Sequence, residues 1–227
     1  MDMNGLPGWV EPLAIVFVAL AVVAAIAVAY DIYGRGHRQP VRSMEAVWVL
    51  SALWLGPFVL PLYARTGRPR SATWQSEHQS GPALGLTADA ASGGLPGGAA
   101  SMIGHVIGVP IVLAAGWTLL DVGMFAMIAL IAVLAIAMLF AFEYATAGRR
   151  HRGGRRITGA LLAATVTVLA FDLGMGGWML LLHFGELMPP LSSVSFLFLM
   201  QIGILLGFLT GLPAVALLLK RGSNITV

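Results

Sequence analysis

The sequence contains no cysteine and very little charge. Without cysteine, the chain can form neither disulfides nor thiolate metal sites. Only 10% of its 227 residues are charged, whereas about 25% is usual in a globular domain. The chain therefore has too little polar surface to face water. Its basic residues fall in short stretches between apolar runs, which argues against nucleic-acid binding.

Signatures of catalysis are also missing. The glycine-rich segment Gly93–Gly98 is not followed by the Lys-Ser/Thr pair of a phosphate-binding loop. The sequence has no His-Glu-x-x-His motif and no Gly-x-Ser-x-Gly elbow. We therefore expect no catalytic residues and no enzyme activity.

Long apolar runs fill most of the chain. Hydrophobic residues make up 58% of it, and the mean hydropathy is +0.87. A helix that crosses a bilayer needs about 20 apolar residues, whereas the strands of a membrane barrel alternate between polar and apolar positions. The runs are uniformly apolar, which predicts an all-α, polytopic membrane protein with about six transmembrane helices. The predicted helices cover residues 12–33, 44–63, 100–119, 123–143, 157–183 and 193–219.

Composition divides the chain into three parts. Residues 1–63 form a predicted N-terminal transmembrane hairpin, and residues 99–227 form a four-helix transmembrane unit. Residues 64–98 between them end in Ser-Gly-Gly-Leu-Pro-Gly-Gly, which is typical of a flexible linker. We expect this linker to be cytoplasmic.

The distribution of basic residues predicts an orientation. Six spans place both termini on the same side of the membrane, together with ten of the 13 Lys and Arg residues. The positive-inside rule then puts both termini in the cytoplasm of a bacterial inner membrane. Arg35, Arg38 and Arg42 fit this poorly, because they fall in the predicted external loop. Either the first helix follows its neighbours, or the number of spans is off by one near the N-terminus.

Several blocks of sequence, in order, resemble a family of bacterial multi-pass membrane proteins of unknown function. The blocks are Trp48–Arg70, Gly94–Gly116, Phe142–Tyr144, Phe171–Met179 and Phe198–Gly203. The resemblance extends from about Asp31 to Lys220 and implies a helical inner-membrane protein. It implies no particular activity.

One motif of that family is degenerate in this chain. The family carries His-Cys-x-x-Gly-Cys-x-x-Gly-Asp before its third span. The corresponding positions here are Pro96, Gly97, Ser101, Gly104 and His105. A cluster of thiols and imidazole is a soft-metal or redox site. Its loss implies that this chain does not carry out such chemistry in the same way.

Polar side chains inside a membrane span are costly and are often functional. The candidates in the predicted spans are His105, Glu143, Asp172, His183 and Gln201. Helical rise places Asp172 and Gln201 at similar depths, and it places His105 and Glu143 near the ends of adjacent helices. Each pair is either an interhelical hydrogen bond or part of a proton or cation path.

Asp172, Met175, Met179 and His183 form a stripe on one predicted helix, at positions i, i+3, i+7 and i+11. Thioether, imidazole and carboxylate groups together can bind copper, and methionine favours Cu(I). Alternatively, the methionines fill gaps in the core. No other cofactor is expected.

Two further groups of residues have structural readings. Small residues four apart let helix backbones approach closely, either within this bundle or against another subunit; they are Gly104, Gly108, Gly203, Gly207 and Gly211. A basic cluster sets membrane topology or binds anionic lipid head groups; it contains Arg149, Arg150, Arg152, Arg155 and Arg156.

Two hypotheses for function follow. The first is a non-catalytic accessory or structural subunit that associates in the bilayer with other membrane proteins or with itself, since the family scaffold is kept while its reactive motif is lost. The second is a small transporter or copper-handling protein that uses the stripe of Asp172, Met175, Met179 and His183.

Overall fold

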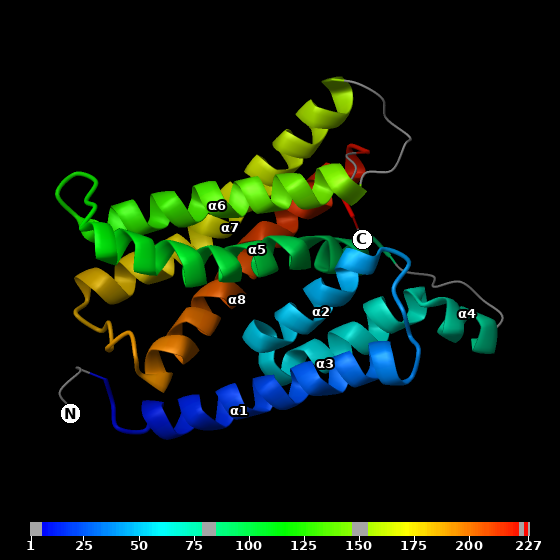
Figure 1. The fold of residues 1–227 in the computed structure, drawn as a ribbon, viewed down its shortest axis with the longest axis horizontal. Coiled ribbons are helices and arrows are strands. Elements are labelled where there is room, and N and C mark those ends of the chain that lie inside the picture. Colours follow the sequence, from blue (N-terminus) through cyan, green and yellow to red (C-terminus); the bar gives the residue numbers. More distant parts are fainter. Residues whose placement is uncertain (1–5, 79–84, 147–153, 223–224, 227) are drawn as a thin grey trace.

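The computed structural model describes residues 6–78, 85–146, 154–222 and 225–226, and these residues are overwhelmingly α-helical (Figure 1). The longer helices are α1 (Val10–Ala29), α2 (Arg42–Leu55), α5 (Leu86–Ala115), α6 (Gly123–Thr146), α7 (Gly154–Phe184) and α8 (Val194–Lys220). The shorter elements are η1 (Tyr30–Gly34), η2 (Gly56–Phe58), α3 (Val59–Leu62), η3 (Tyr63–Gly67), η4 (Arg68–Arg70) and α4 (Ala72–His78).

Six stretches of helix in this part of the chain are long and apolar enough to cross a membrane. Many large apolar side chains on them point outward: Leu173 is 77% exposed and Val106 is 70% exposed. An outer surface of this kind is stable only against lipid. The all-α membrane-protein class predicted from the sequence is confirmed.

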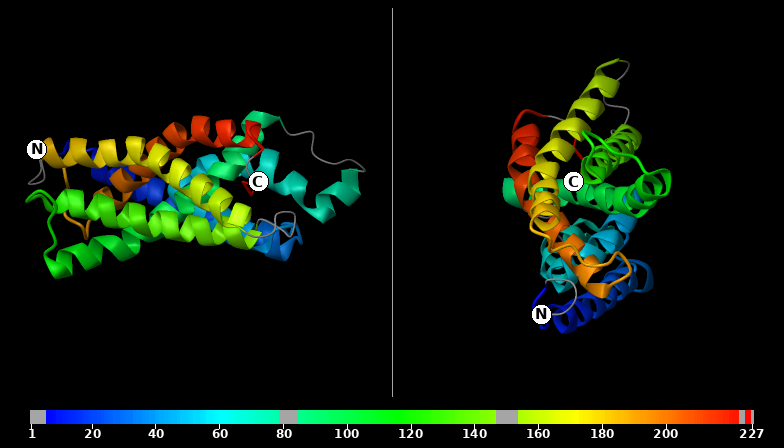
Figure 2. Two further views of the ribbon diagram at one scale, coloured as in Figure 1. Left: turned by 90° about the horizontal axis from the view of Figure 1, so that it is seen from above. Right: turned by 90° about the vertical axis from the view of Figure 1, so that its left-hand side faces the viewer.

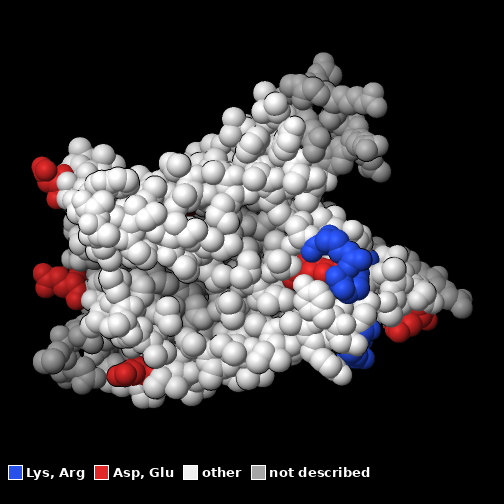
Figure 3. All heavy atoms as spheres, viewed as in Figure 1, with Lys and Arg blue, Asp and Glu red and all other residues white. Residues whose placement is uncertain are grey.

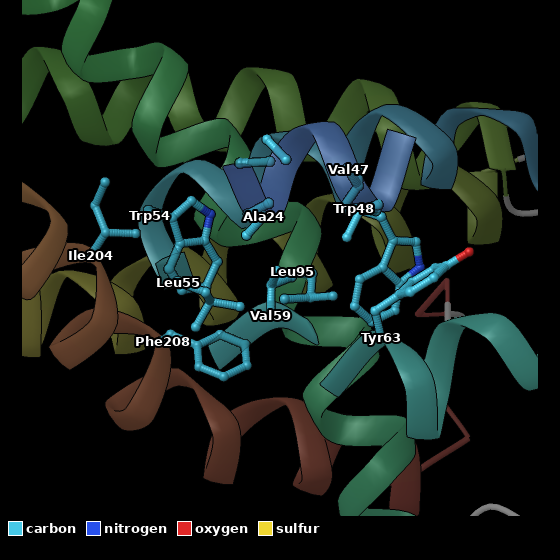
Figure 4. Packing of buried hydrophobic residues seen from close by; sticks show 14 of the residues in the cluster. Ala24, Val47, Trp48, Trp54, Leu55, Val59, Tyr63, Leu95, Ile204 and Phe208 are labelled. Carbon is cyan, nitrogen blue, oxygen red and sulfur yellow. The ribbon is translucent and has the colours of Figure 1, made fainter. Parts of the chain in front are cut away.

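The second of these stretches, Arg42–Arg70, is folded back on itself. The rings of Trp48 in α2 and Tyr63 in η3 have centroids only 5.2 Å apart, and Figure 4 shows the two side chains next to each other. In a straight helix these residues would be about 22 Å apart. Helix α2 therefore enters the bundle, and α3 with η3 returns to the end from which α2 came (Figure 1).

Gly56 makes the reversal possible. Its φ is +58°, a value that side-chain-bearing residues rarely adopt. A Cβ atom at this position would lie 2.6 Å from the Phe17 ring of α1. Pro57 follows, and it has no N–H with which to continue the α2 hydrogen-bond ladder. Local sequence and close contact with α1 thus end α2 before it crosses the bundle.

The reversal changes the predicted topology. α1, α5, α6, α7 and α8 cross the bundle, whereas the α2–α3 hairpin returns to its starting side (Figure 1). The first residues of α1 and the last residues of α8 consequently lie at opposite ends. The prediction that both termini share a side does not hold, because it treated the hairpin as one more crossing.

The folded-back hairpin also removes the misfit in the basic residues. The Lys and Arg side chains that are visible in Figure 3 lie at the end of the bundle where α1 ends. The other described basic residues are in the first turn of α7 and at the end of α8, which lie at the same end (Figure 1). The opposite end carries the acidic residues Glu11, Asp121 and Glu186. Arg35, Arg38 and Arg42 therefore share the basic end with Arg65, Arg68 and Arg70.

Much of the expected linker is helical. Helix α5 begins at Leu86 and runs through the whole Ser-Gly-Gly-Leu-Pro-Gly-Gly segment, which is buried. The glycines allow close packing. A Cβ at Gly98 would lie 2.5 Å from Trp54, and a Cβ at Gly94 would lie 3.0 Å from Phe208. These glycines let large aromatic side chains pack against the helix and do not make the chain flexible. Over residues 86–98 the structure therefore has a buried helix where a flexible linker was expected.

Seen from its end, the bundle has α6 and α7 on one side and α1 with the α2–α3 hairpin on the other (Figure 2). Helices α5 and α8 lie between them. The largest buried cluster joins the hairpin to α1, α5 and α8. It includes Trp48, Trp54, Tyr63, Leu95 and Phe208 (Figure 4).

Replacement of Gly56 by alanine tests the reversal. Gly56→Ala introduces a strained φ and a clash with Phe17, so we expect the unfolding free energy to fall by about 2 kcal/mol or more. The measurement is unfolding of the purified protein in mild detergent. Gly159→Ala in α7 is the matched control, because nothing lies within 4 Å of its Cβ position. The control should be neutral or slightly stabilising, and equal effects of the two variants would contradict the proposed strain.

Candidate functional site

A cluster of histidine, serine and two methionines joins α5 to α7 in the middle of the bundle. The Ser101 hydroxyl donates to Met175 Sδ at 3.2 Å. One turn further on, His105 Nε2 lies 3.4 Å from Met179 Sδ. Ser101 and His105 are four residues apart on α5, and so are Met175 and Met179 on α7. Each pair therefore lies on one face of its helix, and the two contacts between the helices are one turn apart. Met175 and Met179 are 1% and 4% exposed.

The proton on His105 can be placed from its contacts. Nδ1 lies 2.8 Å from the Ser101 carbonyl oxygen, which can only accept, so Nδ1 carries the hydrogen. In the neutral ring, Nε2 then presents a lone pair to the Met179 sulfur, which is itself an acceptor. A second proton would create an imidazolium that no described carboxylate contacts. The geometry thus directs two Lewis bases at each other in an apolar surrounding, an arrangement that suits a soft cation between them.

Only two of the four residues of the stripe predicted on α7 contact α5. Met175 and Met179 meet the α5 residues, but the His183 side chain is exposed and its ring packs against Phe184. Asp172 is half-buried and has no hydrogen-bond or ion-pair partner among the described residues. The imidazole nearest the methionines therefore comes from His105.

Gln201 does not pair with Asp172. Its Nε2 donates to the Leu53 carbonyl oxygen at 2.6 Å. Because α2 ends at Leu55, the last carbonyls of that helix lack helical donors, and the side chain of Gln201 supplies one. The predicted pair is wrong because depth alone does not decide which face of a helix a residue occupies.

Glu143 does not pair with His105 either. Its carboxylate accepts from the backbone N–H and the hydroxyl of Thr226, both at 3.1 Å. The reason is the early start of α5: His105 lies well inside a helix that begins at Leu86, whereas Glu143 lies near the end of α6. Glu143 therefore fastens the C-terminal segment to α6.

A polar network at the basic end was not foreseen from the sequence. The Tyr63 hydroxyl donates to Asp31 Oδ2 at 3.1 Å, and Arg68 Nε donates to His37 Nε2 at 3.2 Å. His37 Nδ1 lies 3.5 Å from the same Asp31 oxygen. Asp31 and Tyr63 both sit in π-helical turns, which often occur at functional positions. The straight-span prediction had placed Asp31 and Arg68 on opposite sides of the membrane.

A second polar contact at this end joins the loop between η1 and α2 to the first turn of α2. Arg38 binds Glu45 through two hydrogen bonds of 2.8 Å. The hydrogen bonds to this carboxylate raise the pKa of the Arg38 guanidinium above its usual value. The Asp31–Tyr63 and His37–Arg68 contacts hold the end of the hairpin, and the Arg38–Glu45 contact holds its start, at the basic end of the bundle.

The small-residue faces are occupied within the bundle. A Cβ at Gly207 would lie 2.5 Å from the Phe171 ring, and a Cβ at Gly203 would lie 2.9 Å from Trp178. Gly104 and Gly108 pack against Ile131 of α6, and Gly211 faces Phe171 as well. In the basic cluster, Arg149, Arg150 and Arg152 lie outside the described residues, while Arg155 and Arg156 are in the first turn of α7.

A groove of about 530 Å³ lies at the turn of the hairpin, between α1, α5 and α8. Its lining is almost wholly apolar and includes Val22, Val106 and Leu197. The few polar groups along it belong to Trp54, His105 and Gln201. The groove exists because the hairpin turns back beside Phe17, so no helix fills that position at the acidic end.

The helices that carry the His–Met cluster are those of a known family. A family model matches residues 88–224. The chain belongs to the DUF4396 family. Its description is a domain of unknown function, in agreement with the resemblance noted in the sequence. A comparison with curated proteins and with solved structures finds no match.

The DUF4396 region covers nearly all of α5 and the whole of α6, α7 and α8. Ser101, His105, Met175 and Met179 therefore lie within it, whereas α1 and the folded-back hairpin lie before it. The groove combines the two parts, because Trp54 comes from the hairpin and Gln201 from the DUF4396 region.

The Gln201 contact can be tested by substitution. Gln201→Leu leaves the Leu53 carbonyl without its donor, so we expect the unfolding free energy in detergent to fall by about 1 kcal/mol. Thr210→Val is the control, since within the described part of the chain the Thr210 hydroxyl bonds only to carbonyls of its own helix. A loss no greater than that of the control would show that Gln201 does not hold the hairpin.

Proposed function

We propose that the protein is an integral membrane protein that binds copper(I) between α5 and α7, through His105 and Met179 with Met175 one turn away. The observation that carries this proposal is the contact of 3.4 Å between His105 Nε2 and Met179 Sδ. It develops the copper-handling hypothesis, with His105 in place of His183.

The spacing of the two atoms fits a shared metal ion. In tetrahedral zinc sites, bonds are about 2.0–2.1 Å to imidazole nitrogen and about 2.3 Å to sulfur. At a tetrahedral angle these lengths put nitrogen and sulfur about 3.5 Å apart, close to the separation in this chain. Neutral thioether ligands favour Cu(I) over zinc. The backbone carbonyl of Ser101 supplies the outer hydrogen bond that orients a metal-binding imidazole.

The sequence resemblance supports the same positions. It places the second cysteine of the family motif at Ser101 and its aspartate at His105. These are the two α5 residues that contact Met175 and Met179. In this account the chain keeps the location of a soft-metal site and changes its ligands to imidazole and thioether.

The basic end would face the cytoplasm of a bacterial inner membrane under the positive-inside rule. The C-terminus would then be cytoplasmic and the start of α1 would lie on the other side. This orientation replaces the earlier expectation of two cytoplasmic termini.

An accessory role without metal stays a prediction with less support. It relied on the loss of the family motif and on glycine faces that could receive another subunit, but Gly104, Gly203 and Gly207 are covered by side chains of this chain. A partner would have to bind elsewhere on the lipid-facing surface.

Copper binding by purified variants tests the proposal. We expect the wild-type protein in detergent to hold about one Cu(I) per chain against a weak competing chelator, and His105→Ala and Met179→Leu each to lose most of it. Met179→Leu conserves volume, so its packing should survive. His183→Ala is the control and should retain the metal.

Two results would contradict the proposal. One is a wild-type protein that binds no copper(I) under reducing conditions. The other is equal loss of copper in His183→Ala and His105→Ala, which would return the site to the original stripe on α7.

A further inference from the structure

A cluster rich in methionine extends from the proposed copper site toward the acidic end of the bundle. Met124, Met179 and Met200 are buried in one apolar cluster, and Met188 in the loop between α7 and α8 packs against it. Met179 is the residue that contacts His105. Met200 also lines the groove beside His105. Three helices and a loop therefore bring four thioethers together on one side of the site.

Helix geometry places these methionines between His105 and the surface at the acidic end. Met179 lies five residues before the end of α7, and Met200 lies six residues after the start of α8. These separations correspond to about 8 and 9 Å along a helix. Met124 is the second residue of α6, and Met188 is partly exposed in its loop. The four side chains thus lead from the surface of the protein to the site.

Charge also distinguishes the two ends of the bundle. Asp121 and Glu186 are exposed in the turns that precede Met124 and Met188. Carboxylates at an opening raise the local concentration of cations. The opposite end carries arginines (Figure 3), which repel them. A soft cation therefore meets first an attractive field and then thioether ligands when it arrives at the acidic end.

The side chains between the site and the basic end are of a different kind. The buried residues next to the site in this direction are apolar and have no sulfur; they include Leu95 on α5 and Val168 and Phe171 on α7. Met138 on α6 packs against the cluster around Val168. Met44 lies near the start of α2, ten residues and about 15 Å before Trp54. A copper(I) ion that moved this way would lack soft ligands over much of the distance.

We propose that copper(I) reaches His105 and Met179 from the acidic end, by transfer along Met188, Met124 and Met200, and that the basic end is closed to it. This inference rests on the proposed function, because it concerns the route to that same site. At each step a bond from copper to one thioether sulfur forms as the bond to the previous one breaks. Copper stays Cu(I), so the transfer needs no oxidant, reductant or proton.

The route restricts what the protein does with the metal. Entry and exit at one end suit an acceptor or carrier that exchanges copper(I) on a single face of the membrane. A channel or a transporter needs ligands that continue to the opposite face. Under the orientation proposed above, the exchanging face is the one opposite the cytoplasm.

The rate of copper(I) loading tests the route. The purified full chain in mild detergent is mixed under reducing conditions with copper(I) held by a weak coloured chelator such as ferrozine, and the loss of colour is followed by stopped-flow absorbance. Met124→Leu combined with Met188→Leu conserves volume and removes the two outermost thioethers. We expect loading to be about tenfold slower. The amount of copper held at equilibrium should not change, because His105 and Met179 remain.

The matched control makes the same change on the other side of the site. Met44→Leu combined with Met138→Leu removes two thioethers from the half of the bundle nearer the basic end. Its loading rate and its copper content should equal those of the wild-type protein. Equal slowing by the control would overturn entry from the acidic end.

The remaining outcomes separate this inference from the proposed function. A wild-type protein that binds no copper(I) overturns both. A wild-type protein that binds copper, with an outer double variant that loads at the same rate, overturns only the route and leaves the outer methionines as core packing. If the double variant folds poorly, Met188→Leu alone decides, because this side chain is only partly buried in a loop: slower loading supports the route, and an unchanged rate overturns it.

Discussion

The reversal at Gly56 is the constraint on which the rest of the structure depends. Its positive φ and its contact with Phe17 end α2 inside the bundle and send the chain back to the basic end. The reversal brings Tyr63 to Asp31 and Arg68 to His37. It leaves the Leu53 carbonyl for Gln201, and it leaves a groove where a full-length helix would have lain. Topology, polar network and groove therefore share one cause.

The sequence predicted the helical class because composition alone decides it. A chain with 10% charge and long apolar runs must form membrane helices. The sequence did not predict the path of Arg42–Arg70, because hydropathy measures how apolar a segment is and does not distinguish a straight helix from a helical hairpin. The misplaced arginines at 35, 38 and 42 were the available signal. The glycines of Ser92–Gly98 have two possible roles, since the same residues that make a linker flexible also let helices pack closely around Trp54 and Phe208.

The candidate site was predictable in part. The spacing of Met175 and Met179 predicted that both lie on one face of a helix, and in the structure both contact α5 from the same face of α7. Their partner could not be identified, because it depends on where α5 starts. A start at Leu86 rather than near residue 100 puts His105 deep enough to meet Met179 and too far from Glu143. The error in the predicted start of α5 therefore led to the wrong partners for His105 and Glu143.

The topology can be measured directly because the chain has no cysteine, so each introduced cysteine is the only thiol. Arg35→Cys, Ser76→Cys and Thr118→Cys place it before the hairpin, after the hairpin and in the α5–α6 turn. A membrane-impermeant maleimide is applied to intact cells and to inverted membrane vesicles. The folded-back hairpin predicts that positions 35 and 76 label from the same side and position 118 from the other. Labelling of 35 and 118 from one side and 76 from the opposite side would contradict the reversal at Gly56 and the account built on it.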